Sequence, residues 1–224
     1  MNLLTTYYEC NIEERHKEYL ECLSNNINNE YIDKIFLFLE DENKPEIEDP
    51  EGKVVMFENS GRVSYSELFQ YCNDNLYGEK CAISNSDIQF DETLKEIYDN
   101  DLGECFVCLS RWELTEEGSL EYERSSDSQD CWIFNSPVPQ LMIDEATFFM
   151  GQPGCDNRIA YISKKAGMIP TNPSPVIRAI HRHLSEHRTY SWCDRLVGLY
   201  LRVYPCDDWE VSRLGFDVNR YEEY

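Results

Sequence analysis

The segment Cys81–Ile88, CAISNSDI, decides the fold class of this sequence. Its first half, Cys81–Ser84, is typical of a buried strand, and this strand stops at the polar triplet Asn85–Asp87. In α/β sheets, ligands bind at the carboxyl ends of strands, so Asp87 is expected at such an edge. A carboxylate there can hold a hard divalent cation, which in turn bridges phosphate oxygens. Asp87 and the nearby Asp91 equally suit turn and helix-cap contacts.

Outward from this segment, predicted strands alternate with predicted helices. Strands are expected over residues 2–8, 32–39, 54–57, 104–110, 131–134 and 177–181. Helices are expected over residues 11–26, 91–98 and 157–166, and from Ser64, which has capping-box spacing to Glu67. Residues 170–175 are expected to form a loop. The alternation predicts an α/β sheet, and the absence of GxGxxG and GxxxxGK[ST] argues against a nicotinamide-binding fold and a P-loop.

The composition indicates a folded domain whose charge is unevenly spread. The chain has 224 residues, and 42% of them are hydrophobic, which is too apolar for a disordered acidic tail. It carries 20 Lys+Arg against 43 Asp+Glu, a net charge of −23, which argues against nucleic acid or an anionic membrane as partner. From Asn157 to Arg202, however, eight basic residues face only two acidic ones, so this segment has a net charge of +6. Such a segment can supply bases for a small anionic ligand.

The ends and the cysteines predict a cytoplasmic protein. The N-terminal residues resemble no signal peptide, and the longest apolar runs, such as Ile35–Leu39, have five residues, far short of a membrane span. Ten cysteines in an unsignalled chain of this size favour reduced thiols. Cys105 and Cys108 form a CxxC pair without a convincing second pair, so we interpret them as buried strand thiols rather than zinc ligands.

A histidine pair lies in the basic segment. If Ile180–His183 is extended, His181 and His183 point to one side of the strand and Arg182 to the other. Either histidine could complete a metal site, while Arg182 or Arg188 could meet a phosphate. The histidines equally suit the core or the solvent. The wider HxHxxxH pattern up to residue 187 does not have the spacing of a known zinc motif.

Two further acids are candidates for proton transfer. Asp156 ends a Gly/Pro loop and precedes a predicted helix, where it suits either a general base or a helix cap. Asp130 precedes the aromatic strand that begins at Cys131, where it suits a second base, a contact to a sugar hydroxyl, or an ordinary turn.

Several stretches occur in an order that resembles a known family. They are TTYYE (5–9), LFLE (37–40), SNSDIQFDETL (84–94), LSRWE (109–113), SQDCWIF (128–134), FFMGQPGCDNRIAY (148–161) and AIHRHLSEHRTY (179–190). The series resembles short, stand-alone glycosyltransferases of the GT-A fold. The resemblance covers roughly residues 1–205 and implies a single GT-A-like, Rossmann-like domain with a mixed, mainly parallel sheet flanked by helices. Residues 206–224 are expected as a tail or terminal helix packed on the same domain.

The resemblance implies a metal-dependent transferase of polysaccharide biosynthesis that uses Mn²⁺ or Mg²⁺. Its partners would be a nucleotide-diphospho-sugar donor and a glycan or other hydroxyl acceptor. Asp87 occupies the position of the family's DxD metal ligand, with Asn85 in place of the first acid. Asp156 occupies the position of the base, with Cys155 in place of the usual Glu, and Asp130 is the second catalytic candidate.

The remaining site residues are implied by the same resemblance. The late metal or diphosphate ligand would be His181 or His183. Donor-binding residues would be Thr5, Tyr7, Glu40, Arg62 and Asn85. Sugar- or acceptor-binding residues would be Arg111, Trp112 and Trp132.

Two other functional classes are compatible with these residues. A metal-dependent phosphoesterase or nucleotidyltransferase could use the same acids and histidines. A catalytically silent carbohydrate- or protein-binding module would suit the 15 Tyr and 4 Trp, and Asn85 in place of an acid favours it. A dense core also explains the aromatic count.

Overall fold

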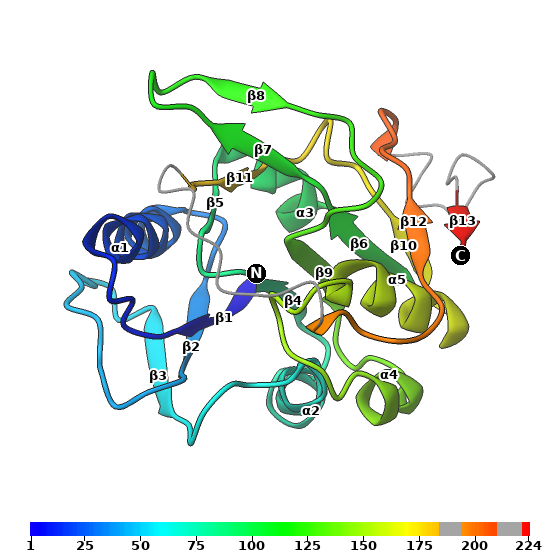
Figure 1. The fold of residues 1–224 in the computed structure, drawn as a ribbon, viewed down its shortest axis with the longest axis horizontal. Helices are drawn as coiled ribbons and strands as arrows, with labels where there is room; N and C mark the ends of the chain where they lie inside the picture. The colour runs from blue at the N-terminus through cyan, green and yellow to red at the C-terminus, as the bar shows by residue number, and fades with distance from the viewer. Residues whose placement is uncertain (184–193, 210–220) are drawn as a thin grey trace.

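The computed structural model describes residues 1–183, 194–209 and 221–224 and confirms the α/β fold (Figure 1). Its main sheet has seven strands in the order β10-β6-β9-β4-β1-β2-β3, and β9 alone of these runs antiparallel to its neighbours. The strands are β1 (Asn2–Tyr7), β2 (Lys34–Leu39), β3 (Val54–Glu58), β4 (Lys80–Ser84), β6 (Cys105–Leu109), β9 (Cys131–Asn135) and β10 (Ile169–Thr171). All except β10 coincide with predicted strands.

Helices cover both faces of this sheet. They are α1 (Glu13–Asn28), α2 (Tyr65–Asn75), η1 (Glu92–Leu94), α3 (Lys95–Asp99), α4 (Gln140–Glu145) and α5 (Cys155–Lys165). The predicted capping box is confirmed, because Ser64 accepts a hydrogen bond from the Glu67 backbone while Glu67 accepts one from the Ser64 backbone. The short helix α4 was not predicted.

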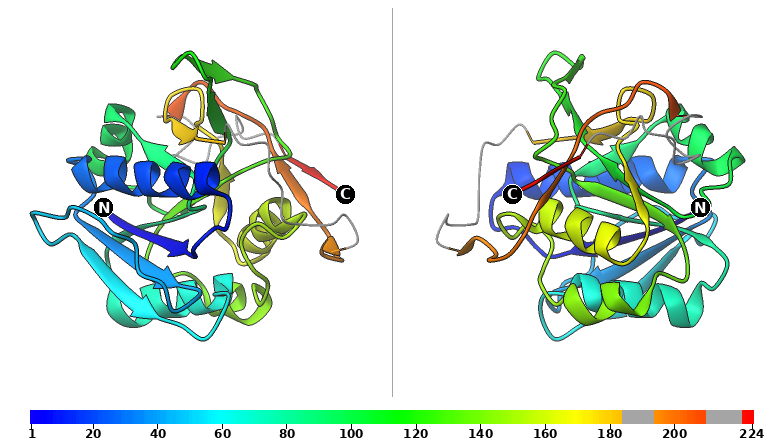
Figure 2. Two further views of the ribbon diagram at one scale, coloured as in Figure 1. Left: turned by 60° about the vertical axis from the view of Figure 1, so that its left-hand side comes forward. Right: turned by 90° about the vertical axis from the view of Figure 1, so that its right-hand side faces the viewer.

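The core consists of two layers separated by the sheet. Along β2, Phe36 and Phe38 lie in the layer under α2, α4 and α5, whereas Ile35, Leu37 and Leu39 lie in the layer under α1 and α3. Figure 2 shows α1 on one side of the sheet and α2 and α4 on the other. A strand buried on both faces needs a continuous apolar run, which is why β2 was easy to predict. Each fully buried side chain of this size contributes about 1.5–3 kcal/mol through apolar burial.

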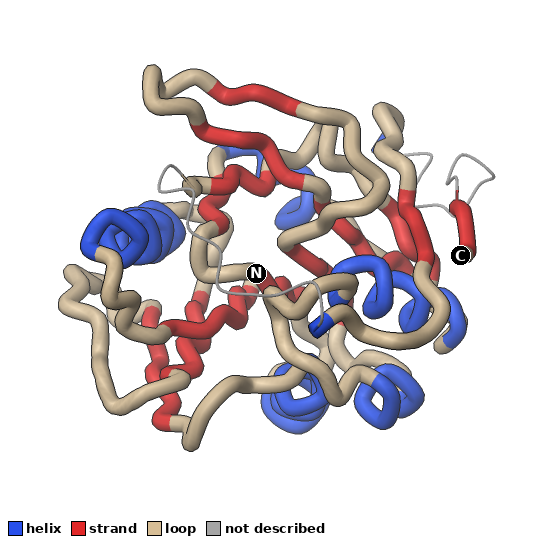
Figure 3. The backbone as a smooth tube through the Cα atoms, in the orientation of Figure 1, coloured by secondary structure: helices blue, strands red, loops and turns tan. Residues whose placement is uncertain are grey.

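A second sheet forms beside the main one. Its order is β5-β11-β7-β8, with β5 (Ile88–Phe90), β7 (Arg111–Leu114), β8 (Leu120–Tyr122) and β11 (Ala179–His181). The β7–β8 hairpin extends past the upper edge of the main sheet in the view of Figure 3. Only β11 was predicted, since β7 and β8 are short, partly exposed strands without an apolar run. Pairing of β11 with β5 carries residue 181 to the end of β4.

The described residues near the C-terminus pack against the same domain. Strand β12 (Leu201–Val203) pairs antiparallel with β13 (Tyr221–Glu223), and β12 packs against α5. Residues 210–220, part of the predicted tail or terminal helix, lie outside the described residues.

Residues 169–171 form a strand where a loop was predicted. Proline lacks a backbone N–H, so in a sheet it is tolerated mainly at an edge. Strand β10 is such an edge strand beside β6, and Pro170 lies opposite Phe106. The prolines that suggested a loop therefore mark the border of the sheet.

The described cysteines form no disulfide with one another, and the CxxC pair lies in a buried strand, as predicted. All nine cysteines among the described residues are free, and Cys105 and Cys108 are buried in β6. None of the described helices has the length and apolar character needed to cross a bilayer.

Candidate functional site

A cavity of about 1030 Å³ opens along the carboxyl ends of β1, β2 and β4. Because β9 runs the other way, the residues just before it reach the same edge. Nine predicted site residues line the cavity: Glu40, Arg62, Asn85, Asp87, Arg111, Asp130, Asp156, His181 and His183. The fold thus gathers residues that are up to 143 positions apart, from Glu40 to His183.

The predicted donor-binding residues of strand β1 do not line the cavity, but the residues next to them do. Thr6 and Tyr8 line the cavity, whereas Thr5 and Tyr7 are buried and Tyr7 packs in the core. The Thr5 hydroxyl donates to the Ser84 carbonyl at 2.9 Å, which fixes β1 to β4. Successive side chains of a strand point to opposite faces, so the cavity is lined by Thr6 and Tyr8 and not by the predicted Thr5 and Tyr7.

Neither predicted tryptophan lines this cavity. Trp132 is 1% exposed and packs edge-on against Tyr65 in the core, so no sugar can reach it. Trp112 stacks on Tyr122 with ring centroids 4.7 Å apart, and its indole N–H donates to the Ser174 carbonyl at 2.8 Å. Trp132 therefore belongs to the core, and the partly exposed Trp112 lies outside the residues that line this cavity.

Asp87, His181 and His183 form a compact group of potential metal ligands. One ligand atom of each lies within 4.8 Å of the others. Two buried atoms of the group, Asp87 Oδ1 and His183 Nε2, have no hydrogen-bond partner among the described residues. Buried polar atoms are rarely left without a partner, so these two atoms fit a ligand that the described part of the chain does not supply. A carboxylate and two imidazoles suit Mn²⁺, Zn²⁺ or Fe²⁺.

His181 is oriented by carboxylates on both sides. Its Nδ1 lies 2.7 Å from Glu113 Oε2, and its Nε2 lies 3.2 Å from Asp87 Oδ2. Burial lowers the pKa of His181, but the two carboxylates outweigh burial and raise the pKa to about 9. Burial likewise raises the pKa of Asp87, yet His181 and Arg15 hold it below the usual range. A carboxylate behind a metal-binding histidine fixes the orientation of the ring, and Glu113 has this position.

The two candidate bases differ in their surroundings. Asp130 Oδ1 accepts a hydrogen bond from Asn85 at 2.7 Å, and Oδ2 accepts one from Arg111 at 3.1 Å. Asp156 is partly exposed in the cavity, and burial raises its pKa to about 7, against the lowering effect of the Asn157 backbone N–H. A base works best when its pKa lies near the working pH, so Asp156 suits proton transfer, whereas both carboxylate oxygens of Asp130 are already hydrogen-bonded.

Two solved structures share this arrangement of strands and helices. A mannosyltransferase from Pyrobaculum calidifontis, in complex with GDP-Man and Mn²⁺, matches 84% of this chain with a TM-score of 0.51 and 12% identity. This chain covers 58% of that protein. A 4-diphosphocytidyl-2C-methyl-D-erythritol synthase matches 86% of this chain and 94% of its own, with a TM-score of 0.50 and 13% identity.

This chain has a GT-A-type fold. At such low identity the likeness establishes the fold alone. No family model matches the sequence, and no match was found among curated proteins.

Some residues of the GT-A cavity were missed by sequence reasoning. They are Thr6, Tyr8, Arg15, Tyr19, Gln129, Arg202 and Tyr224. One signal for Arg15 existed, since it lies four residues before Tyr19 on the buried face of α1. A charge on the apolar side of a helix needs a buried partner. Tyr224 gave no such signal, because its contact with Asn157 joins residues 67 positions apart. His187 and Arg188 lie outside the described residues.

The loop before α5 depends on a left-handed glycine. Gly154 has φ +83°, and a Cβ at this position would lie 3.0 Å from the ring of Tyr200. We expect Gly154→Ala to lower the free energy of unfolding by about 2–3 kcal/mol through backbone strain and this contact.

Gly118→Ala is the matched control for this change. Gly118 has a similar φ of +80° but no atom within 4 Å of an added Cβ, so about 1 kcal/mol of strain is expected. Urea unfolding measures both variants. Equal losses would show that the contact with Tyr200 contributes nothing.

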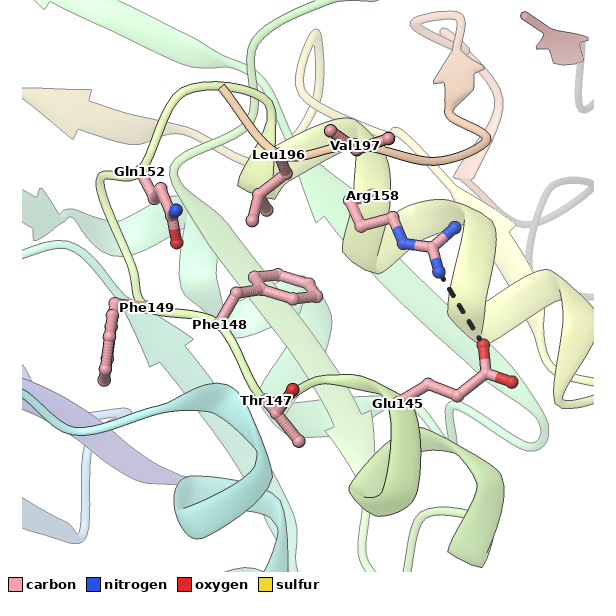
Figure 4. Close-up of a pocket in the computed structure, with 8 residues that line it drawn as sticks. All are labelled: Glu145, Thr147, Phe148, Phe149, Gln152, Arg158, Leu196 and Val197. Carbon is pink, nitrogen blue, oxygen red and sulfur yellow. Dashed lines mark ion pairs between the residues drawn. The ribbon is translucent and has the colours of Figure 1, made fainter. Parts of the chain in front are cut away.

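Figure 4 shows the residues that line a second, smaller hollow of about 400 Å³. Phe149 and Gln152 line both spaces. Its wall includes Phe148, Leu196 and the Glu145–Arg158 pair that Figure 4 shows at one side. The hollow therefore offers an extension of the site with a mixed polar and apolar lining, on the side of the loop that precedes Asp156.

Proposed function

We propose that this protein transfers a sugar from a nucleotide-diphospho-sugar to a hydroxyl acceptor with the help of a divalent ion such as Mn²⁺, which suits two imidazoles and a carboxylate better than Mg²⁺ does. The observation that carries the proposal is the Asp87–His181–His183 group, whose three residues line one cavity with Asp156. The complex of the fold neighbour with GDP-Man and Mn²⁺ supports the same donor class.

Asp87, His181 and His183 would hold the divalent ion. When bound, the ion would neutralise the charge that develops on the diphosphate leaving group. Since the pKa of His181 is about 9, a cation at Nε2 would displace a proton, and binding should weaken as the pH falls.

The ends of β1 and β2 would hold the nucleotide. Thr6 and Tyr8 replace the predicted Thr5 and Tyr7 here, beside Glu40 and Arg62. Burial raises the pKa of Glu40, and Arg62 opposes this shift. A carboxylate and a guanidinium facing one cavity can accept from and donate to the polar edge of a base or ribose.

On the other side of the cavity, Asp156 would take the proton of the acceptor hydroxyl. Asp130, which binds Asn85 and Arg111, would keep these two side chains in place instead of acting as base. The hollow beside Phe149 would receive the part of the acceptor that lies beyond the reacting hydroxyl.

Thermal shift with nucleotides tests the donor class. We expect UDP or GDP at about 100 times its dissociation constant, with Mn²⁺, to stabilise the fold by about 2.7 kcal/mol. For a chain of this size that raises Tm by roughly 5–10 °C. The control is the same nucleotide with EDTA, which should give a smaller shift. If no nucleoside diphosphate shifts Tm under either condition, the transferase proposal is wrong.

Nucleotidyl transfer is the second candidate. It is favoured by the fold neighbour named as a diphosphocytidyl synthase, 94% of which is matched. Product analysis separates the two activities. Sugar transfer releases a nucleoside diphosphate from a nucleotide-sugar, whereas nucleotidyl transfer releases pyrophosphate from a nucleoside triphosphate. Binding of a donor without release of either product would point to a silent binding module.

A further inference from the structure

A buried arginine lies directly behind the candidate metal ligands. Arg15, on α1, is 7% exposed. Its Nη2 donates to Asp87 Oδ2, and its Nη1 donates to Glu18 Oε2 at 2.8 Å and to the Arg182 carbonyl at 3.2 Å. Its Nε donates to the Tyr19 hydroxyl at 3.1 Å. A guanidinium has five N–H donors, so these four contacts leave little of it for a phosphate.

These contacts reach every element that carries a candidate ligand. The bond from Arg15 engages Oδ2 of Asp87. The other carboxylate oxygen, Oδ1, has no partner among the described residues and stays free to bind an ion. The Arg182 carbonyl belongs to the residue between His181 and His183. A second bond, from the Arg182 backbone N–H to the Asp87 carbonyl at 2.9 Å, ties the same two segments together.

We propose that Arg15 is a positioning residue that pre-forms the divalent-metal site by holding Asp87 and the His181–His183 segment in place. This inference rests on the metal site of the proposed function. The guanidinium bonds the carboxylate and the carbonyl through two separate nitrogens of a planar fork, and a lysine ammonium, with one nitrogen on a flexible stem, does not reproduce that geometry. Glu18 and Tyr19 in turn hold the guanidinium, so the arrangement does not depend on the metal.

The test is Mn²⁺ titration of the full chain without nucleotide, followed by calorimetry and by electron paramagnetic resonance of free Mn²⁺. We expect Arg15→Gln to weaken Mn²⁺ binding about 10–100-fold, the range typical of residues that orient metal ligands. Arg15→Lys keeps the charge and should fall between Arg15→Gln and the wild type. Lys17→Gln, an exposed change on the same helix, should bind as the wild type does.

Circular dichroism at the titration temperature separates positioning from folding. If Arg15→Gln does not fold, Arg15→Lys decides the matter. Wild-type affinity in a folded Arg15 variant would overturn the inference while leaving the metal site intact. Absence of Mn²⁺ binding in the wild type itself would overturn the metal site and, with it, the role of Arg15.

Discussion

Asp87→Asn is expected to abolish Mn²⁺ binding and to slow sugar transfer by at least about a thousandfold, equivalent to roughly 4 kcal/mol of transition-state stabilisation. The carboxylate is the anionic member of the candidate metal group, and its Oδ1 is one of the two unpartnered atoms. An amide keeps the size of the side chain but removes the charge. Calorimetric Mn²⁺ titration and the rate of nucleoside diphosphate release measure the two effects.

The same substitution should also destabilise the fold. Removing one partner of a buried ion pair costs about 3–5 kcal/mol, and the loss should lie at the lower end here because Arg15 keeps Glu18 and His181 keeps Glu113 as partners. Binding and turnover must therefore be measured at a temperature where circular dichroism shows a folded chain. Asp99→Asn, an exposed acid that pairs only with Lys95 among the described residues, is the control and should leave both unchanged. Retained Mn²⁺ binding in Asp87→Asn would place the ion elsewhere.

Asp156→Asn is expected to have two effects of opposite direction. Turnover should fall about 10²–10⁴-fold, because the proposed base is lost while the donor site is untouched. In the wild type, kcat/KM should rise with pH through about 7, the pKa of Asp156, because only the carboxylate accepts a proton. The pH profile of nucleoside diphosphate release checks this limb, which should be missing from any residual activity of Asp156→Asn.

Although Asp156→Asn should lower turnover, it should raise the free energy of unfolding. The pKa of Asp156 is raised from 3.8 to about 7 in the folded state, so the folded chain holds a proton that the unfolded chain has lost between these values. The contribution of Asp156 to wild-type stability therefore falls as the pH rises from about 4 to 7. Asn does not titrate, so the variant should be more stable than the wild type at pH 8 by about 1–3 kcal/mol, allowing for solvent at the partly exposed carboxyl.

Urea unfolding at pH 4 and pH 8 measures this difference. The variant should gain stability relative to the wild type only at the higher pH. Asp144→Asn, an exposed acid on α4, should show no such change with pH. Equal stability of Asp156→Asn and wild type at pH 8 would show that Asp156 has an ordinary pKa.

Periodicity identified the strands that are buried on both faces, whereas the family resemblance does not determine which face of a strand a side chain occupies. The resemblance implied Trp132 as a sugar-binding residue, yet the register with β4 places it in the core. It implied Thr5 and Tyr7 as donor-binding residues, whereas Thr6 and Tyr8 line the cavity. The unpredicted strand β7 supplies Glu113, which orients His181 across 68 residues.

The sequence by itself determined that this chain forms an α/β sheet, and that Asp87, Asp156 and the His181–His183 pair are its chemical candidates. These predictions depend on local sequence patterns, because an apolar strand that ends in polar residues can be recognised from about eight consecutive residues. Only the tertiary structure decided which candidates meet. Pairing of β11 with β5 brings His181 to Asp87, and packing of α1 places Arg15 behind both. Such long-range contacts are set by strand register and helix packing, whose energies are spread over the whole core.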